Sequence, residues 1–77
     1  MPKTIVLYSQ PGCPPCGWVE QFLTSKGVPY IKRDIQKDEE ALQELMRLKS
    51  QSTPTLVVGN RVMIGFDPDQ LEQWLAE

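Results

Sequence analysis

The chain has 77 residues, 23% of them charged, with a formal net charge of −2, two cysteines and no histidine. A chain this short is expected to form one domain over residues 1–77, and it buries only about 60% of the surface exposed on unfolding. The eight Lys and Arg residues are scattered, which excludes a basic nucleic-acid surface, and no apolar run approaches the roughly 20 residues of a membrane helix.

The first part of the chain predicts a buried strand followed by a helix. Residues 5–8 form an unbroken apolar run rich in β-forming side chains, which is typical of a central strand covered on both faces. Turn-forming residues follow at 9–12. From residue 14 to 26 the apolar side chains recur at helical spacing, and Gly27 with Pro29 predicts the end of this helix.

The middle of the chain predicts a second strand and a second helix. Residues 28–35 alternate in polarity but are mixed, which favours a strand at the edge of the sheet. Residues 38–49 begin with acidic side chains and end with basic ones, as suits the helix dipole. The expected buried stripe of this helix is Ala41, Leu42, Leu45, Met46 and Leu48.

The last part predicts a hairpin and a third helix. Residues 55–58 and 61–64 are β-like runs joined by Gly59 and Asn60, a good hairpin signal. Asp67 can cap a helix that begins at Pro68, and Gln70 can complete a capping box. Trp74 and Phe22 are expected in the core, whereas Trp18 is either partly exposed or buried.

These elements predict an α/β fold with the order β-α-β-α-β-β-α. The first two strands, joined by a helix, should be parallel, and the hairpin must be antiparallel. We therefore expect a four-stranded mixed sheet with helices on both faces.

The two cysteines form a Cys-Pro-Pro-Cys motif at residues 13–16. Cys13 is expected at a helix N-terminus, where unpaired N–H groups and the dipole favour a thiolate. Cysteines in such positions have pKa values lowered from about 8.5 to between roughly 3.5 and 7.5. Because Pro14 and Pro15 remove two amide donors, we expect a moderate lowering for Cys13.

Cys16 follows one helical turn inward, within disulfide reach of Cys13. This spacing supports two-step exchange, in which Cys13 attacks a substrate disulfide and Cys16 resolves the mixed disulfide. A bridge between them closes too short a loop to be a structural staple, and two thiolates are too few for a closed zinc site. The cysteines are therefore predicted to be catalytic, with no metal site.

The predicted location is the cytoplasm. Residues 1–4 lead directly into the first strand without the apolar stretch and cleavage site of a signal peptide. In the cytoplasm a C-x-x-C pair normally cycles between redox states. Nothing indicates an obligate assembly, so we expect a monomer that binds neither nucleic acid nor membrane.

Over its whole length the chain resembles glutaredoxins and the wider thioredoxin-like superfamily. The features are Tyr8 before the cysteine loop, the Cys-Pro-x-Cys motif, Thr53-Pro54 before the hairpin, and Gly65-Phe66-Asp67 before the last helix. The resemblance implies a thioredoxin-like (glutaredoxin) fold and a thiol–disulfide oxidoreductase that carries electrons without a bound cofactor.

The resemblance also implies a substrate groove around the cysteines. Pro54 would be cis beside the two sulfurs, and the backbone of Thr53 would pair with an extended substrate segment. Gly65, Phe66 and Asp67 would line the same groove, where glutaredoxins hold the glutamyl end of glutathione. The alternative is that Gly65 only ends a strand, Phe66 belongs to the core and Asp67 only caps the last helix.

Three departures from the glutaredoxin pattern concern the electron donor. Glutaredoxins usually have tyrosine where Pro15 stands, and that ring forms one wall of the glutathione site, so the resemblance implies that Pro15 is a substrate-binding residue. Many glutaredoxins also have lysine near Gln10 and a backbone N–H where Pro68 has none. These changes weaken the expected hold on glutathione as a co-substrate. With these changes the chain is similar to glutaredoxin-like redoxins, which behave as small thioredoxins. Those redoxins are reduced by a flavoprotein reductase and serve enzymes such as ribonucleotide reductase. The sequence leaves open whether glutathione or a thioredoxin-reductase-type flavoprotein is the donor.

Two other classes of function stay open. A metal or iron–sulfur carrier would use Cys13 and Cys16 as ligands, although the two prolines stiffen the loop between them. A redox-inert binding module would retain only the fold, and its activity would not depend on Cys13.

Overall fold

The computed structural model describes residues 4–77; residues 1–3, which the expected domain includes, lie outside the described residues. The elements are β1 (Ile5–Ser9), α1 (Pro14–Ser25), β2 (Ile31–Asp34), α2 (Glu39–Arg47), β3 (Thr55–Val58), β4 (Arg61–Ile64) and α3 (Pro68–Ala76). The predicted order is confirmed. No helix within residues 4–77 has the length and apolar character needed to cross a membrane.

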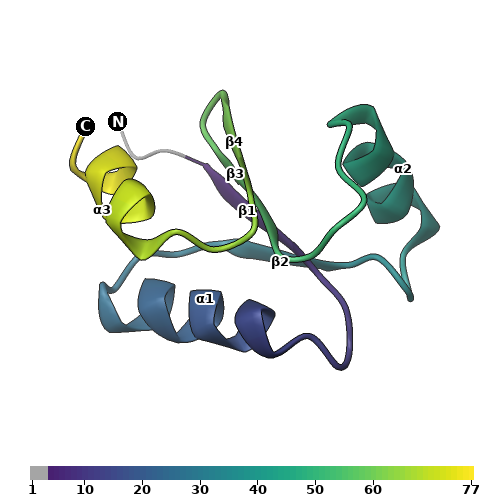
Figure 1. The fold of residues 1–77 in the computed structure, drawn as a ribbon, viewed down its shortest axis with the longest axis horizontal. Coiled ribbons are helices and arrows are strands. Elements are labelled where there is room, and N and C mark those ends of the chain that lie inside the picture. Colours follow the sequence, from purple (N-terminus) through teal and green to yellow (C-terminus); the bar gives the residue numbers. More distant parts are fainter. Residues whose placement is uncertain (1–3) are drawn as a thin grey trace.

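The four strands form one mixed sheet in the order β2-β1-β3-β4 (Figure 1). β1 pairs in parallel with β2, with Val6 opposite Ile31, and antiparallel with β3, with Val6 opposite Val57. The β3–β4 hairpin is antiparallel and turns at residues 59–60, as predicted. β1 therefore has neighbours on both sides, which accounts for its unbroken apolar sequence.

Helices cover both faces of the sheet, with α1 and α3 on one face and α2 on the other (Figure 1). Alternate residues of β1 serve the two sides: Leu7 packs toward α1 and α3, and Tyr8 toward α2. Phe22 and Trp74 are half-buried against the larger core, while Trp18 is 57% exposed. The larger core consists of Ile5, Leu7, Val19, Leu23, Leu56, Val58, Met63 and Leu71.

The second strand is shorter than predicted, because residues 28–30 and 35 do not belong to it. Gly27 has φ of +67° and ends α1, and the Val28 amide then bonds back to the Leu23 carbonyl at 3.0 Å. Pro29 has no N–H to donate to a neighbouring strand. After Asp34 the chain turns, because the Gln36 amide bonds to Asp34 Oδ1 at 2.9 Å. β2 is an edge strand, as expected.

The buried stripe predicted for the second helix is wrong at two positions. Ala41 and Leu45 are buried, but Leu42 is 37% exposed and Met46 is 65% exposed. α2 covers its face of the sheet alone, so only the side chains directly over the strands are enclosed (Figure 1). Leu42 and Met46 instead line an open apolar groove with Ile35. The helix itself is also shorter than residues 38–49, with Asp38 as its N-cap.

Candidate active site

Cys13 caps the N-terminus of α1, directly after the β1–α1 loop. Its backbone is extended, and its Sγ accepts a 3.3 Å hydrogen bond from the Cys16 amide. Pro14 and Pro15 occupy the first turn, where an N–H would have no intrahelical acceptor. The Cys16 amide is therefore the first donor that this helix end offers to a thiolate at Cys13.

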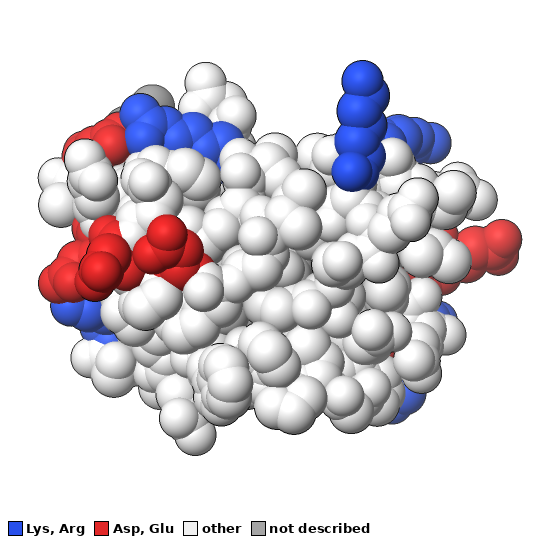
Figure 2. Space-filling view, viewed as in Figure 1, with Lys and Arg blue, Asp and Glu red and all other residues white. Residues whose placement is uncertain are grey.

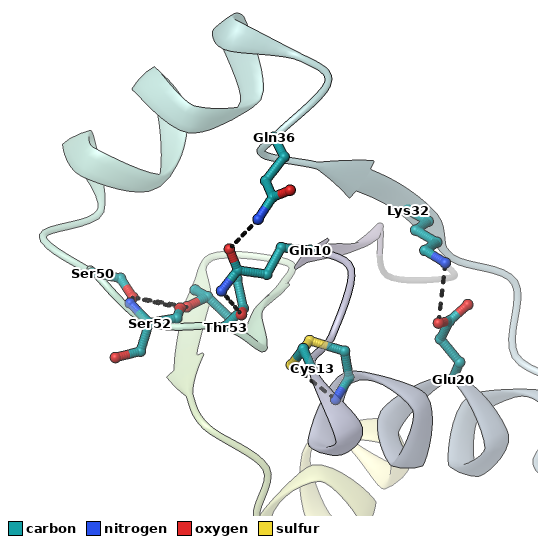
Figure 3. The surroundings of a disulfide bond; sticks show 10 residues. Gln10, Cys13, Glu20, Lys32, Gln36, Ser50, Ser52 and Thr53 are labelled. Carbon is teal, nitrogen blue, oxygen red and sulfur yellow. Dashed lines mark hydrogen bonds and ion pairs between the residues drawn. A yellow bond between two sulfur atoms is a disulfide. The ribbon is translucent and has the colours of Figure 1, made fainter.

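Cys13 and Cys16 are joined by a disulfide, with their Cα atoms 5.3 Å apart (Figure 3). Cys13 is half-buried, whereas Cys16 is only 3% exposed. Cys13 is thus the more accessible of the two cysteines, while Cys16 is shielded. This asymmetry is what an attacking and a resolving cysteine require.

The loop before β3 is linked to the cysteine loop by one glutamine. The Thr53–Pro54 peptide bond is cis, as the resemblance implied, and Pro54 is buried. Gln10 donates from Nε2 to Thr53 Oγ1 at 3.0 Å, and Gln36 donates to Gln10 Oε1 at 3.2 Å (Figure 3). The amide of Gln10 therefore has a hydrogen-bond partner at both its nitrogen and its oxygen, at the position near which many glutaredoxins have lysine.

Two buried hydroxyl groups hold the same loop from inside. Ser50 is 2% exposed and Thr55 is 0% exposed, and their Oγ atoms lie 2.8 Å apart. Thr55 also donates to the carbonyl of Ser52 at 2.7 Å, and the Ser52 amide donates to Ser50 at 3.3 Å. Buried polar groups need hydrogen-bond partners. These bonds therefore hold the backbone on both sides of Thr53 in place. The sequence pattern did not predict this cluster.

Gly65 adjoins the cis proline, as a shared groove would require. It follows β4 with φ of +90°, a conformation that favours glycine, and its amide donates to the Pro54 carbonyl at 2.8 Å. Pro15 is half-buried in the first turn of α1, two residues after Cys13. The substrate-binding roles of Gly65, Pro15 and Thr53 stay predictions.

Phe66 and Asp67 both have structural roles in the described fold. The ring of Phe66 meets Phe22 edge-on, with centroids 5.8 Å apart, and is half-buried against the core. Asp67 is exposed and caps α3, with its Oδ1 accepting from the Gln70 amide at 3.2 Å. These contacts match the core and cap alternatives, and groove contacts by the same residues stay predictions.

A cleft of about 220 Å³ opens beside the disulfide, and it contains charged groups that the sequence analysis missed. Lys32 Nζ lies 3.2 Å from Glu20 Oε2 (Figure 3). The Tyr30 hydroxyl donates to Glu20 Oε1 at 3.1 Å. The sequence does contain one indication of this position: Glu20 follows Cys16 by four residues, which places both on one face of the helix. The lining is Ser9, Gln10, Pro11, Gly12, Cys13, Cys16, Gly17, Glu20, Lys32 and Asp34.

Tyr8 directs its side chain to the opposite face of the sheet. Its hydroxyl donates to Glu44 Oε1 at 2.8 Å, and Arg33 lies 3.4 Å from the same oxygen. Burial, followed by the hydrogen bond to Glu44, raises the pKa of Tyr8 to about 12. Tyr8 is therefore a neutral structural donor at ordinary pH, and it anchors α2 to β1.

On the face of the molecule that Figure 2 draws, the charged side chains lie toward the margins. Figure 2 shows a broad uncharged area, with basic and acidic side chains at its left and upper right margins. Within residues 4–77, no three His, Cys, Asp or Glu side chains are grouped closely enough to hold a metal ion.

Comparison with known proteins identifies the family. The glutaredoxin family model matches residues 5–63, which include both cysteines, Thr53 and Pro54. The chain belongs to the glutaredoxin family. Its membership and its Cys13–Cys16 pair at disulfide distance together support a redox function.

Several relatives of this glutaredoxin-family chain are similar over nearly its full length. The gene 56 protein of Mycobacterium phage D29 is 37% identical over 73 residues, covering 90% of this chain and 79% of the phage protein. The thioredoxin-like protein BC3987 superposes with a TM-score of 0.90 at 41% identity, covering 94% of this chain and 100% of that one. NrdH-redoxin from Escherichia coli, a glutaredoxin-like protein, shares the fold with a TM-score of 0.84 at 20% identity, covering 91% and 92%. These neighbours confirm the expected thioredoxin-like glutaredoxin fold.

Proposed function

We propose that this chain is a dithiol oxidoreductase that reduces disulfides of other proteins. The Cys13 thiolate attacks one substrate sulfur, forms a mixed disulfide and releases the other substrate sulfur as a thiolate. Cys16 then attacks the Cys13 sulfur, releases the second substrate thiolate and forms the Cys13–Cys16 disulfide. Two electrons pass from the dithiol to the substrate. The observation that carries the proposal is a half-buried Cys13 at a helix N-terminus with the buried Cys16 one turn behind it.

The proposed electron donor is a flavoprotein of the thioredoxin-reductase type rather than glutathione. Glutathione carries a carboxylate at each end, so it binds best where free cations meet it. Here the neutral Gln10 is engaged by Thr53 and Gln36, and the adjoining cleft contains the carboxylates of Glu20 and Asp34. The relative at 41% identity is described as thioredoxin-like, which supports the same choice.

The proposed partners are protein disulfides, with ribonucleotide reductase as one candidate substrate, together with the flavoprotein donor. No bound cofactor is proposed, and glutathione is the competing co-substrate. A cytoplasmic location and a monomeric state stay predictions.

Reduction of insulin disulfides by the purified chain tests this function. NADPH is supplied in parallel with thioredoxin reductase, or with glutathione and glutathione reductase. We expect turnover with the flavoprotein and little with glutathione. Turnover with glutathione alone would reverse the choice of donor, and no turnover with either would overturn the oxidoreductase itself.

Two cysteine variants test the assigned roles. Cys13→Ser should abolish reduction, and Cys16→Ser should accumulate a mixed disulfide with the substrate, visible as an added mass that a reductant removes. Normal turnover of protein disulfides by Cys16→Ser would overturn the resolving role. Activity that is unchanged in Cys13→Ser would favour the redox-inert binding module. Visible absorbance with bound iron after anaerobic purification would favour the iron–sulfur alternative.

A further inference from the structure

The cleft beside the disulfide contains a carboxylate that the exchange reaction described above does not use. Glu20 and Cys16 both line this cleft and lie four residues apart on α1. Residues at that spacing share one face of a helix. Figure 3 shows the side chain of Glu20 extending from α1 toward β2 on the same side as the disulfide.

Glu20 is held in place by groups from the β2 side of the cleft. Lys32 lies 3.2 Å from Oε2, and Tyr30 donates to Oε1 at 3.1 Å. Burial, and then the hydrogen bond to Glu20, raise the pKa of Tyr30, so it stays a donor at neutral pH. Asp34 also lines the cleft, but its Oδ1 accepts from the Gln36 amide. The titratable groups around Glu20 are thus Tyr30, which bonds to it, and four residues that line the same cleft: Lys32, Asp34, Cys13 and Cys16.

Resolution of the mixed disulfide requires Cys16 to lose a proton. An ordinary thiol has a pKa of about 8.5, so Cys16 begins largely protonated near pH 7. Cys16 is 3% exposed, so bulk water is largely kept from its sulfur. The cleft that Cys16 and Glu20 both line has about 220 Å³ and a polar lining, which is room enough for water.

We propose that Glu20 accepts, through water in this cleft, the proton that Cys16 loses when it resolves the mixed disulfide. This inference rests on the proposed dithiol function. The proton passes from the Cys16 thiol to the carboxylate, and the sulfur electron pair forms the bond to Cys13. The bond between Cys13 and the substrate sulfur breaks, and the substrate leaves as a thiolate. Glu20 then passes the proton to solvent, which restores the carboxylate, and Cys16 takes up a proton again when a reductant later opens the Cys13–Cys16 disulfide.

Stopped-flow reaction of the reduced chain with 5,5′-dithiobis(2-nitrobenzoate) separates the two steps. The first release of the coloured thiolate reports attack by Cys13 and depends on reagent concentration. The second release reports resolution by Cys16, and its rate does not depend on reagent concentration. We expect Glu20→Gln to slow only the second phase near pH 6–7, by roughly 10²-fold, the low end of general acid–base effects. The difference should vanish above about pH 9, where a thiol ionises without help.

The sign of the effect separates proton transfer from simple electrostatics. Removing a negative charge near Cys16 would by itself favour the thiolate and accelerate the second phase. A slower phase that recovers at high pH therefore indicates a lost proton acceptor. Glu20→Asp, which keeps the carboxylate, should restore part of the rate.

Glu72→Gln is the matched control. It removes a carboxylate from another surface pair, Lys26–Glu72, whose atoms lie 2.9 Å apart beyond the other end of α1. We expect it to leave both phases unchanged, and thermal unfolding of each variant shows that the fold is retained.

An unchanged or faster second phase in Glu20→Gln, or equal slowing at every pH, would overturn the inference. So would equal slowing in Glu72→Gln. If the wild-type chain fails to reduce protein disulfides, the proposed function itself fails. If it succeeds while Glu20→Gln resolves normally, only the role of Glu20 fails.

Discussion

The side-chain amide of Gln10 donates a 3.0 Å hydrogen bond to the hydroxyl of Thr53, and so joins two loops that are 43 residues apart in the chain. One loop leads into Cys13, and the other contains the cis Pro54. Gln36 donates a further hydrogen bond to the side-chain oxygen of Gln10. A neutral side chain with hydrogen bonds at both ends of its amide thus lines the cleft beside the reactive sulfurs, where a cation would serve an anionic substrate.

Replacing Gln10 by lysine should shift the chain toward glutathione. A charge-assisted hydrogen bond to a carboxylate contributes about 1.5–3 kcal/mol. We therefore expect kcat/KM for a glutathione mixed disulfide to rise at least about tenfold, since 1.4 kcal/mol corresponds to a factor of ten. Gln10→Met removes the same hydrogen bonds without adding charge and should give no rise. An equal rise in both variants would show that the link between the loops, rather than the missing charge, limits glutathione.

Two substitutions of Asp67 distinguish its role as the N-cap of α3 from a role in substrate binding. Asp67→Ala removes the acceptor for the Gln70 amide and should lower the free energy of unfolding by about 1 kcal/mol. Asp67→Ser keeps an acceptor and should retain both stability and insulin reduction. Urea unfolding and the insulin assay measure the two properties. A stable Asp67→Ser variant with reduced turnover would instead assign Asp67 to the substrate groove.

The hydroxyl cluster behind the cis-proline loop should be costly to disrupt. Thr55→Val preserves volume but removes the donor to the Ser52 carbonyl and the partner of Ser50, in a site that is fully buried. We expect a loss of about 1–3 kcal/mol in the free energy of unfolding. Ser50→Ala should cost less in the Thr55→Val background than alone, because the two hydroxyls are coupled. Strictly additive losses in urea unfolding would argue against a coupled cluster.

The raised pKa of Tyr8 should make stability fall at high pH. Tyrosine in the unfolded chain ionises with a pKa of about 10, whereas folded Tyr8 ionises at about 12. Below pH 10 both states keep the proton, and the contribution is fully present. Above pH 10 the unfolded state releases its proton first, so the free energy of unfolding falls toward pH 12, by at most about 1.4 kcal/mol per pH unit.

Tyr8→Phe isolates this titration, because every other ionisable group is common to both proteins. The stability advantage of the wild type over the variant should shrink between about pH 9, one unit below the pKa of tyrosine in the unfolded chain, and about pH 11.5, just below the pKa of Tyr8 in the folded chain. Urea unfolding across that range measures it. A difference that does not change with pH would contradict the assignment to Tyr8.

Features that depend on neighbours along the chain could be predicted from the sequence. Gly27 ends α1, Asp67 caps α3, and the hairpin turns at residues 59–60. Each of these depends on backbone conformations or hydrogen bonds made within a few residues. The Cys13–Cys16 pair belongs to the same class, because one helical turn sets its spacing.

Features that depend on tertiary packing could not be predicted from neighbouring residues in the sequence. Leu42 and Met46 have the spacing of buried residues, but their exposure depends on what else covers α2. The Glu20–Lys32 pair joins a helix to a strand and requires the register of β2 against β1. The bond from Gln10 to Thr53 likewise requires the whole sheet to bring its two loops together.

The isolation of α2 on its own face of the sheet has a consequence for how the molecule opens (Figure 1). Its buried side chains are only Ala41 and Leu45, with Glu44 bonded to Tyr8 beside them. Local unfolding is easiest where few apolar contacts must be broken. Amide hydrogens of α2 should therefore exchange with solvent before those of β1 and β3, while α1 and its cysteines remain folded on the opposite face.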